Sequence, residues 1–298
     1  MSVRLEMLQV ARLAPKVLGE SSELVHQFLL RQQNADGGFK DRSGRSDLYY
    51  TVFGLEGLLA LQVPLPMERT VSFLNSLGTG EGLDFVHLCC LARCRAALAL
   101  NKTPTDPPTN WSREIAARIE RFRSADGGYH VLPGSPAGTA YGCFLAVAAY
   151  QDLKLTLPVP LDVARCLKFL ETSDGAWANE RQVRRGATNA TAAAVTLLRQ
   201  LSLPIAPAVG DWLLARCHHA GGFSATPDAP IPDLLSTATA LHALAGLERD
   251  CGRLKEKCLD FVDTLWSNEG GFHGHWNDDT LDCEYTYYGL LALGHLSL

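Results

Sequence analysis

The chain has 298 residues, 47% of them hydrophobic and 20% charged, so it can bury a large core and is not expected to be disordered. It carries 27 Lys plus Arg against 32 Asp plus Glu, a net charge of −5, which argues against bulk attraction to nucleic acid or to an anionic membrane. No apolar run reaches the roughly 18 residues of a membrane span. The N-terminus lacks the pattern of a signal peptide, so we expect a cytoplasmic protein that binds no nucleic acid.

A short glycine-rich turn recurs along the chain. Its first glycines lie at steps of 45, 45, 48, 46 and 49 residues, at Gly37, Gly82, Gly127, Gly175, Gly221 and Gly270. Self-similarity at a period of this size is typical of repeat architectures, in which each repeat is one supersecondary unit. The sequence therefore predicts six units that cover nearly the whole chain.

Each unit reads as two helices joined by the turn. In the first unit a helix is predicted over residues 22–33, with Leu24, Phe28 and Leu29 at helical spacing. The glycines then let the chain turn at little cost, and an aromatic residue follows that we expect to pack against the core. After a polar loop, the second helix is nearly all apolar, as in residues 49–55 and 141–145, which indicates burial on all sides.

These units predict an all-α protein, an (α/α)6 barrel with inner and outer helix rings, formed by residues 1–298 as a single domain. Neither end of the chain shows the polar capping face that an open array needs. Small residues such as Ala192, Ala193 and Ala194 in a predicted inner helix permit close approach around a central cavity. Both features favour a closed ring over an open solenoid.

The pattern resembles the α/α-toroid superfamily of protein prenyltransferase β subunits and of squalene and other terpene cyclases. The resemblance rests on the repeated turns, of which residues 33–39 (QNADGGF) are the cleanest, and on residues 134–143 (GSPAGTAYGC). It covers about the whole chain. It implies an isoprenoid chain in an aromatic-lined cavity and, in the prenyltransferases, a zinc ion held by a D-x-C motif and a later His, with a cationic cluster for the diphosphate.

The implied zinc ligands are not intact in this sequence. With the fourth unit matched to the D-x-C unit, the three positions hold Ala187, Asn189 and Ser236. With the fifth unit matched instead, they hold Asp233, Leu235 and Tyr285. Neither register leaves the three protein ligands that zinc requires, so we regard Zn²⁺ as doubtful.

The implied diphosphate cluster is partly retained. The family's Arg and Lys fall on Arg181 and Arg184 within residues 180–186 (ERQVRRG), and Arg185 adds a third guanidinium. Guanidinium groups suit bidentate phosphate contacts, so these three arginines are predicted to bind substrate. The family histidine that also contacts the diphosphate corresponds to Pro136.

An acidic cluster lies near the C-terminus. Asp278, Asp279 and Asp282 spell D-D-x-x-D, a pattern that holds Mg²⁺ and a diphosphate in class I terpenoid enzymes, and magnesium prefers oxygen ligands. We predict these three aspartates as catalytic and metal-binding residues, and Asp233 as a further catalytic candidate. The alternative is a solvated loop with Asp233 and Asp282 as helix N-caps. The D-x-D-D acid motif of class II cyclases is absent, and another acid is not excluded.

Aromatic residues gather at the starts of predicted inner helices. Those predicted to bind substrate are Tyr49, Tyr50, Tyr141, Phe144, Tyr285 and Tyr288, with Phe53 and Tyr287 in the same cluster. Their faces can line a lipid tunnel and stabilise a carbocation. The alternative for any one of them is ordinary core packing.

Three functions remain open. The first is an enzyme that processes an isoprenoid diphosphate, by prenyl transfer or terpene cyclisation, with Mg²⁺ as the candidate cofactor. The second is a zinc-dependent prenyltransferase β-like subunit with relocated ligands, such as Asp233, Asp282 and Cys283, and a partner subunit. The third is a non-catalytic toroid that binds a lipid or a partner protein. The sequence leaves open whether the chain pairs with a partner subunit or forms a homodimer.

Overall fold

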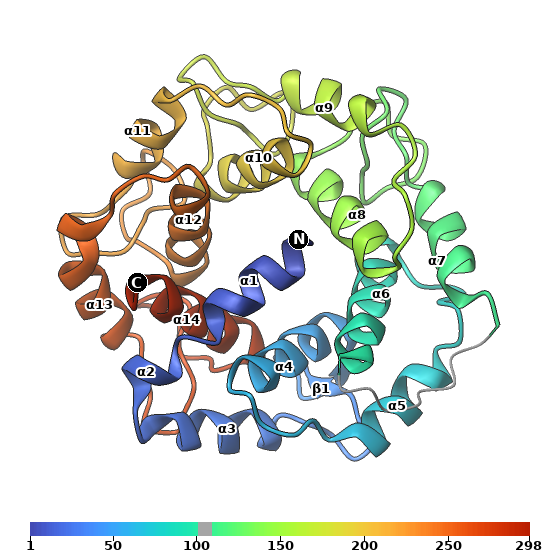
Figure 1. Cartoon of the computed structure of the whole chain (residues 1–298), viewed down its shortest axis with the longest axis horizontal. Coiled ribbons are helices and arrows are strands. Elements are labelled where there is room, and N and C mark those ends of the chain that lie inside the picture. Colours follow the sequence, from blue (N-terminus) through green and yellow to red (C-terminus); the bar gives the residue numbers. More distant parts are fainter. Residues whose placement is uncertain (101–108) are drawn as a thin grey trace.

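The computed structural model describes residues 1–100 and 109–298 and forms a closed ring of helix pairs (Figure 1). The outer helices are α3 (Ser21–Arg31), α5 (Met67–Ser76), α7 (Trp111–Glu120), α9 (Pro160–Lys168), α11 (Ala208–Leu214) and α13 (Lys255–Asp263). The inner helices are α4 (Leu48–Ala60), α6 (Phe85–Ala99), α8 (Ala140–Asp152), α10 (Thr188–Gln200), α12 (Leu234–Gly246) and α14 (Cys283–Leu296). Each inner helix contacts the next, and α14 returns to α4, which confirms the predicted (α/α)6 barrel.

The remaining elements are short. They are α1 (Val3–Ala11), α2 (Pro15–Leu18), a 3₁₀ turn at Gly252–Leu254, and two antiparallel strands, β1 (Phe39–Lys40) and β2 (Ser46–Asp47). None of the helices in the described ranges is both long enough and apolar enough to cross a bilayer.

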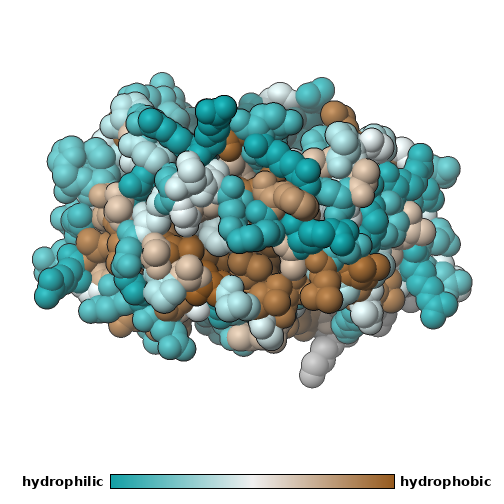
Figure 2. Space-filling view, turned by 90° about the horizontal axis from the view of Figure 1, so that it is seen from above, coloured by the Kyte–Doolittle hydropathy of each residue, from teal (hydrophilic) through white to brown (hydrophobic). Residues whose placement is uncertain are grey.

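Inner and outer helices differ in how much of their surface is covered. In α4 every residue from Thr51 to Ala60 is buried, because neighbouring helices contact it on several sides. In α9, by contrast, Val163, Cys166 and Leu167 are buried while Arg165 and Lys168 are exposed. Figure 2 shows the side of the ring that is uppermost in Figure 1, where hydrophobic side chains gather across the middle among hydrophilic ones.

The glycine turns link neighbouring units. Gly37 has a φ of +97°, and a Cβ there would overlap the carbonyl oxygen of Arg69 in α5. Gly270 has a φ of +96°, and a Cβ there would overlap the carbonyl oxygen of Leu24 in α3. The first turn thus packs against the outer helix of the second unit, and the last turn packs against the outer helix of the first. Glycine is required at both because the backbone is left-handed and the approach is close.

A buried threonine ties each of several turns to its inner helix. The Thr51 hydroxyl accepts a hydrogen bond from the N–H of Phe39 (2.9 Å) and donates one to the carbonyl of Asp47 (2.6 Å). The same pair of bonds recurs at Thr237 with Phe223, and related bonds are made by Thr191 and Thr286. The aromatic side chains at these turns are buried, as expected from the sequence: Phe39, Tyr129, Trp177, Phe223 and Phe272.

Helix α1 lies across the inside of the ring, where the inner helices end (Figure 1). Its Arg4 is buried and pairs with Glu56 of α4 (Nη1–Oε1, 3.3 Å) and with Asp152 of α8 (Nε–Oδ1, 3.0 Å). Its Glu6 pairs with Arg199 of α10 (3.0 Å). We call this end of the barrel the floor, and the opposite end, where the inner helices begin, the mouth.

The threonine bonds give the first testable prediction. Thr237→Val keeps the side-chain shape but leaves the buried N–H of Phe223 without an acceptor, so we expect the free energy of unfolding to fall by about 1–3 kcal/mol. Denaturant titration measures it. Thr226→Val, at a partly exposed loop position, serves as the control and should change it by less than about 0.5 kcal/mol. Equal effects of the two substitutions would contradict the structural role of the hydroxyl.

Candidate functional site

The inner ring encloses a cavity of about 330 Å³, which lies within the range of ligand pockets, roughly 300–1,000 Å³. Most of its lining is apolar. All six inner helices and α1 contribute to it, with Met7, Tyr49, Val52, Phe53, Cys89, Cys90, Arg93, Tyr141, Phe144, Leu145, Ala148, Ala149, Asp152, Asn189, Ala192, Ala193, Thr196, Leu235, Thr239, His242, Tyr287 and Tyr288.

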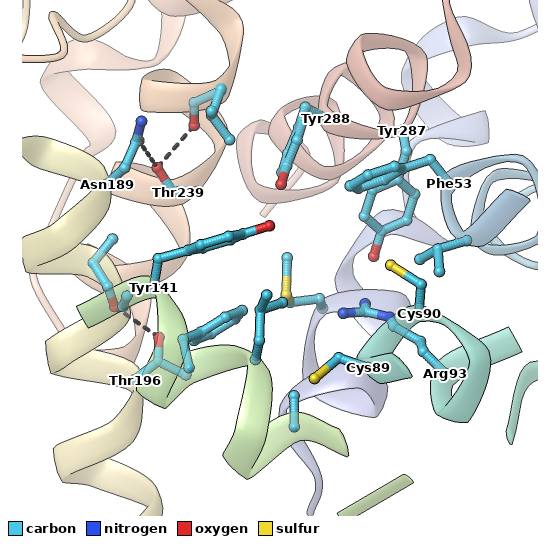
Figure 3. A pocket seen from close by; sticks show the side chains of 18 of the residues that line it. Phe53, Cys89, Cys90, Arg93, Tyr141, Asn189, Thr196, Thr239, Tyr287 and Tyr288 are labelled. Atoms are coloured by element: carbon cyan, nitrogen blue, oxygen red, sulfur yellow. Dashed lines mark hydrogen bonds between the residues drawn. The ribbon is translucent and has the colours of Figure 1, made fainter. Parts of the chain in front are cut away.

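One wall of the cavity is aromatic (Figure 3). The Phe53 ring lies 5.0 Å from the ring of Tyr49 and 5.4 Å from that of Tyr288, measured between centroids. Tyr141 and Phe144 face this wall from α8, and Tyr141 remains 39% exposed, which places an opening of the cavity at the mouth. Ring faces directed into an apolar space are suited to a hydrocarbon chain and to a cation formed on it.

Two of the predicted aromatic residues lie outside the cavity lining. Tyr50 is partly buried beside Tyr49, with ring centroids 5.6 Å apart. The guanidinium carbon of Arg42 lies over the Tyr285 ring, 5.4 Å from the ring centroid. Both belong to the rim of the mouth. Of the six aromatic residues predicted to bind substrate, the lining therefore holds Tyr49, Tyr141, Phe144 and Tyr288.

A carboxyl group that the sequence did not single out, that of Glu284, lies next to a lining residue without itself lining the cavity. Tyr49 donates a hydrogen bond from its hydroxyl to Glu284 Oε1 over 2.6 Å. Burial of Glu284 raises the pKa of its carboxyl to about 7, against the opposing effect of the Tyr49 hydrogen bond. Glu284 is therefore partly protonated near neutral pH and positioned by a residue that lines the cavity.

The three aspartates of the D-D-x-x-D pattern are not arranged as a free ligand set. Arg42, from the loop between β1 and β2, pairs with Asp278 (3.2 Å) and Asp282 (2.9 Å). Asp282 also caps α14 by accepting from the N–H of Tyr285 (2.9 Å), while Asp279 is exposed. In the described part of the chain, no group of three or more His, Cys, Asp or Glu side chains is placed to hold a metal ion.

The oxygens that Mg²⁺ needs are thus already used by Arg42 and by backbone N–H groups, and these residues as placed do not fit the ion. Cys283, a relocated zinc ligand in the second hypothesis, is fully buried in α14. Metal binding stays a prediction from the sequence.

Asp233 is a helix cap. Its carboxylate accepts a hydrogen bond from the N–H of Ser236 (2.7 Å) at the start of α12, and burial raises its pKa. Asp47 and Asp84 cap α4 and α6 in the same way, and His87 bridges them at 3.0 and 2.8 Å. The mouth therefore carries carboxylates at the N-termini of α4, α6, α12 and α14, where the helix dipole favours negative charge.

The three predicted phosphate-binding arginines lie in the loop before α10, at the mouth end of the barrel. Arg181 pairs with Asp126 (2.6 Å) and stacks over Phe169. Arg185 pairs with Asp228, and Arg184 is exposed. None of the three lines the cavity. Two of the guanidiniums thus already have carboxylate partners.

Sequence reasoning also missed Arg93, Asp152 and His242, which line the cavity near the floor. A signal was present for Arg93, because a charged residue interrupts the otherwise apolar stretch around Cys89 and Cys90. Asp152 and His242 gave no such signal, since their position depends on the closure of the ring.

The raised pKa of Glu284 gives a pH prediction. Because the folded pKa (about 7) exceeds the ordinary 4.5, the stability contributed by the protonated carboxyl is present below pH 4.5 and lost as the pH rises to 7. Glu284→Gln has no such loss. The stability of this variant relative to the wild type should rise between these pH values, by on the order of 1–3 kcal/mol. Denaturation over this range measures the difference, and a pH-independent difference would contradict the shift.

Comparisons with known proteins agree with this architecture. A fold neighbour is a variant of the type II terpene cyclase MstE from Scytonema, in complex with geranylgeranyl dihydroxybenzoate, with a TM-score of 0.63 and 12% identity over 95% of this chain and 97% of that chain. A protein from Actinoplanes has a TM-score of 0.63 and 17% identity over 94% and 99%. At these identities the likeness shows a shared fold.

No curated protein matches the sequence. The family model for the prenyltransferase alpha-alpha toroid domain matches residues 16–90 and 190–297, which is more than half of the chain and includes the first two glycine turns and the last two. The chain belongs to the prenyltransferase alpha-alpha toroid domain family.

Proposed function

We propose that this protein is an enzyme that binds an isoprenoid in the central cavity and cyclises it through a carbocation. The observation that carries the proposal is the cavity itself, an apolar space inside the ring with the aromatic wall formed by Tyr49, Phe53 and Tyr288. Such a space excludes water, which would quench a cation, and its ring faces stabilise positive charge. Membership of the toroid family and the shared fold with a type II terpene cyclase support an isoprenoid as the substrate.

Glu284 is the proton donor in this proposal. A general acid works best with a pKa near the working pH, and burial brings the pKa of Glu284 to about 7. Its proton adds to a terminal alkene and forms a tertiary cation, which neighbouring double bonds attack to close rings. Loss of a proton from the final cation to the Glu284 carboxylate, directly or through solvent, restores the acid. Tyr49 holds the carboxyl at the cavity edge.

Ionisation of an isoprenoid diphosphate, by cyclisation or prenyl transfer, is the second candidate. It is favoured by the exposed Arg184 beside Arg181 and Arg185 at the mouth end of the barrel. We rank it lower because Asp126 and Asp228 occupy two of these guanidiniums. Diphosphate binding by Arg181 and Arg185 requires these two pairs to open, and Mg²⁺ binding by Asp278 and Asp282 requires their pairs with Arg42 to open.

The test is incubation of purified protein with farnesol and geranylgeraniol and with their diphosphates, with and without Mg²⁺, followed by product analysis. A cyclic product that keeps its hydroxyl or diphosphate head group supports protonation by Glu284. Release of diphosphate supports the second candidate instead. Tight binding of the isoprenoid without any product would overturn an enzymatic function and favour a lipid-binding toroid.

A substitution sharpens the test. Glu284→Gln keeps the hydrogen-bond acceptor for Tyr49 but removes the acid, so formation of a cyclic product should fall by about 10²–10⁴-fold while isoprenoid affinity is retained. Glu256→Gln, exposed on α13, is the matched control and should leave the rate unchanged. Equal rates for Glu284→Gln and wild type would rule out Glu284 as the donor.

A further inference from the structure

The floor of the cavity carries buried polar atoms that make no hydrogen bond of normal geometry. They are Arg93 Nε, Tyr287 Oη, Asp152 Oδ2 and His242 Nε2 within the described part of the chain. Arg93 is ion-paired with Glu56, and its guanidinium lies close to the Tyr287 hydroxyl. The four residues come from four different inner helices, α6, α14, α8 and α12, and all line the cavity. Figure 3 shows the Tyr287 hydroxyl and the Arg93 guanidinium on the same side of this space.

Unpartnered buried groups are costly and need an explanation. Each costs about 1–3 kcal/mol when it is left unsatisfied, and in native proteins such groups usually contact a ligand or an ordered water. Here they gather in one cavity. Tyr287 follows Glu284 by three residues in α14, but its hydroxyl lies near Arg4, Glu56 and Arg93. A ligand atom that forms hydrogen bonds with these groups would therefore be bound strongly at the floor of the cavity.

The charges at the floor limit the kind of ligand group. Arg4 bridges Glu56 and Asp152, and Arg93 Nε lies 3.6 Å from Glu56 Oε1, beyond hydrogen-bond length. Two guanidiniums thus face two carboxyl groups, so the floor has no net charge that would favour a strongly charged ligand. What remains is a donor on Arg93, a hydroxyl on Tyr287 and an acceptor on Asp152, which together match an oxygen that both accepts and donates.

We propose that the floor, through Arg93, Tyr287 and Asp152, binds an oxygen function of the substrate, a hydroxyl or carboxyl group carried at the end opposite the reacting alkene. This inference rests on the proposed function, because an acid at the mouth requires the alkene to lie at the mouth. The substrate class is accordingly an isoprenoid with an oxygen-bearing head group that enters first.

The test uses two probes that differ by one oxygen, farnesol and farnesene. Their affinities are measured by displacement of a fluorescent isoprenoid analogue from the wild type, Tyr287→Phe and Arg93→Met. Tyr287→Phe removes a hydroxyl that makes no hydrogen bond of normal geometry within the described chain and keeps the buried ring, so it is expected to fold. We expect the ratio of farnesol to farnesene affinity to fall by about threefold to tenfold in Tyr287→Phe, and by about tenfold or more in Arg93→Met.

Tyr150→Phe is the matched control, because the Tyr150 hydroxyl bonds to Glu120 outside the cavity, and it should leave the ratio unchanged. Tyr287→Phe alone decides the matter if Arg93→Met does not fold. A ratio that is the same in the wild type and in the folded floor variants would mean that the unpartnered atoms bind water only, and would overturn the inference. Failure of both probes to bind the wild type would instead overturn the proposed function, and the inference with it.

Discussion

The barrel depends on a hydrogen bond that joins each of several glycine turns to the first turn of an inner helix. At Thr51, Thr191, Thr237 and Thr286 a buried hydroxyl accepts the N–H of the aromatic residue that follows the turn. The bond fixes where the inner helix begins relative to the turn, and the turn packs against the neighbouring outer helix. Because the same constraint acts in successive units, these inner helices start at the same end of the barrel, and a common mouth and floor result.

Parallel inner helices make the two ends of the cavity chemically different. Their N-termini favour negative charge and their C-termini favour positive charge. The mouth accordingly carries the capping aspartates of α4, α6, α12 and α14, and the floor carries Arg4, which also contacts the carbonyl of Ala96 near the end of α6. The carboxyl groups at the mouth and the balanced guanidinium–carboxylate pairs at the floor thus give the two ends of the cavity different chemistry.

The period of the glycine turns was enough to predict the ring, because it is a property of the sequence alone. The site was predictable only in part. Tyr49 lines the cavity while Tyr50 does not, since one residue turns a helix face by about 100° and the direction of the cavity is set by the assembled ring. The D-D-x-x-D pattern suggested a metal site from local spacing, whereas Asp278 and Asp282 are held by Arg42, about 240 residues earlier in the chain. No local pattern shows such a partner.

Helix α1 closes the floor of the cavity, so a substrate has to enter from the mouth. Arg4 and Glu6 tie α1 to α4, α8 and α10 at the floor. Access through that end would require the two buried ion pairs of Arg4 to break, and breaking a buried pair typically costs about 3–5 kcal/mol. The partly exposed Tyr141 marks the easier route at the mouth. A long substrate on the proposed route must therefore enter with one end leading, and the polar atoms at the floor select which end that is. The same arrangement leaves the trailing hydrocarbon end beside Glu284, so that the orientation set by the floor places the alkene next to the acid.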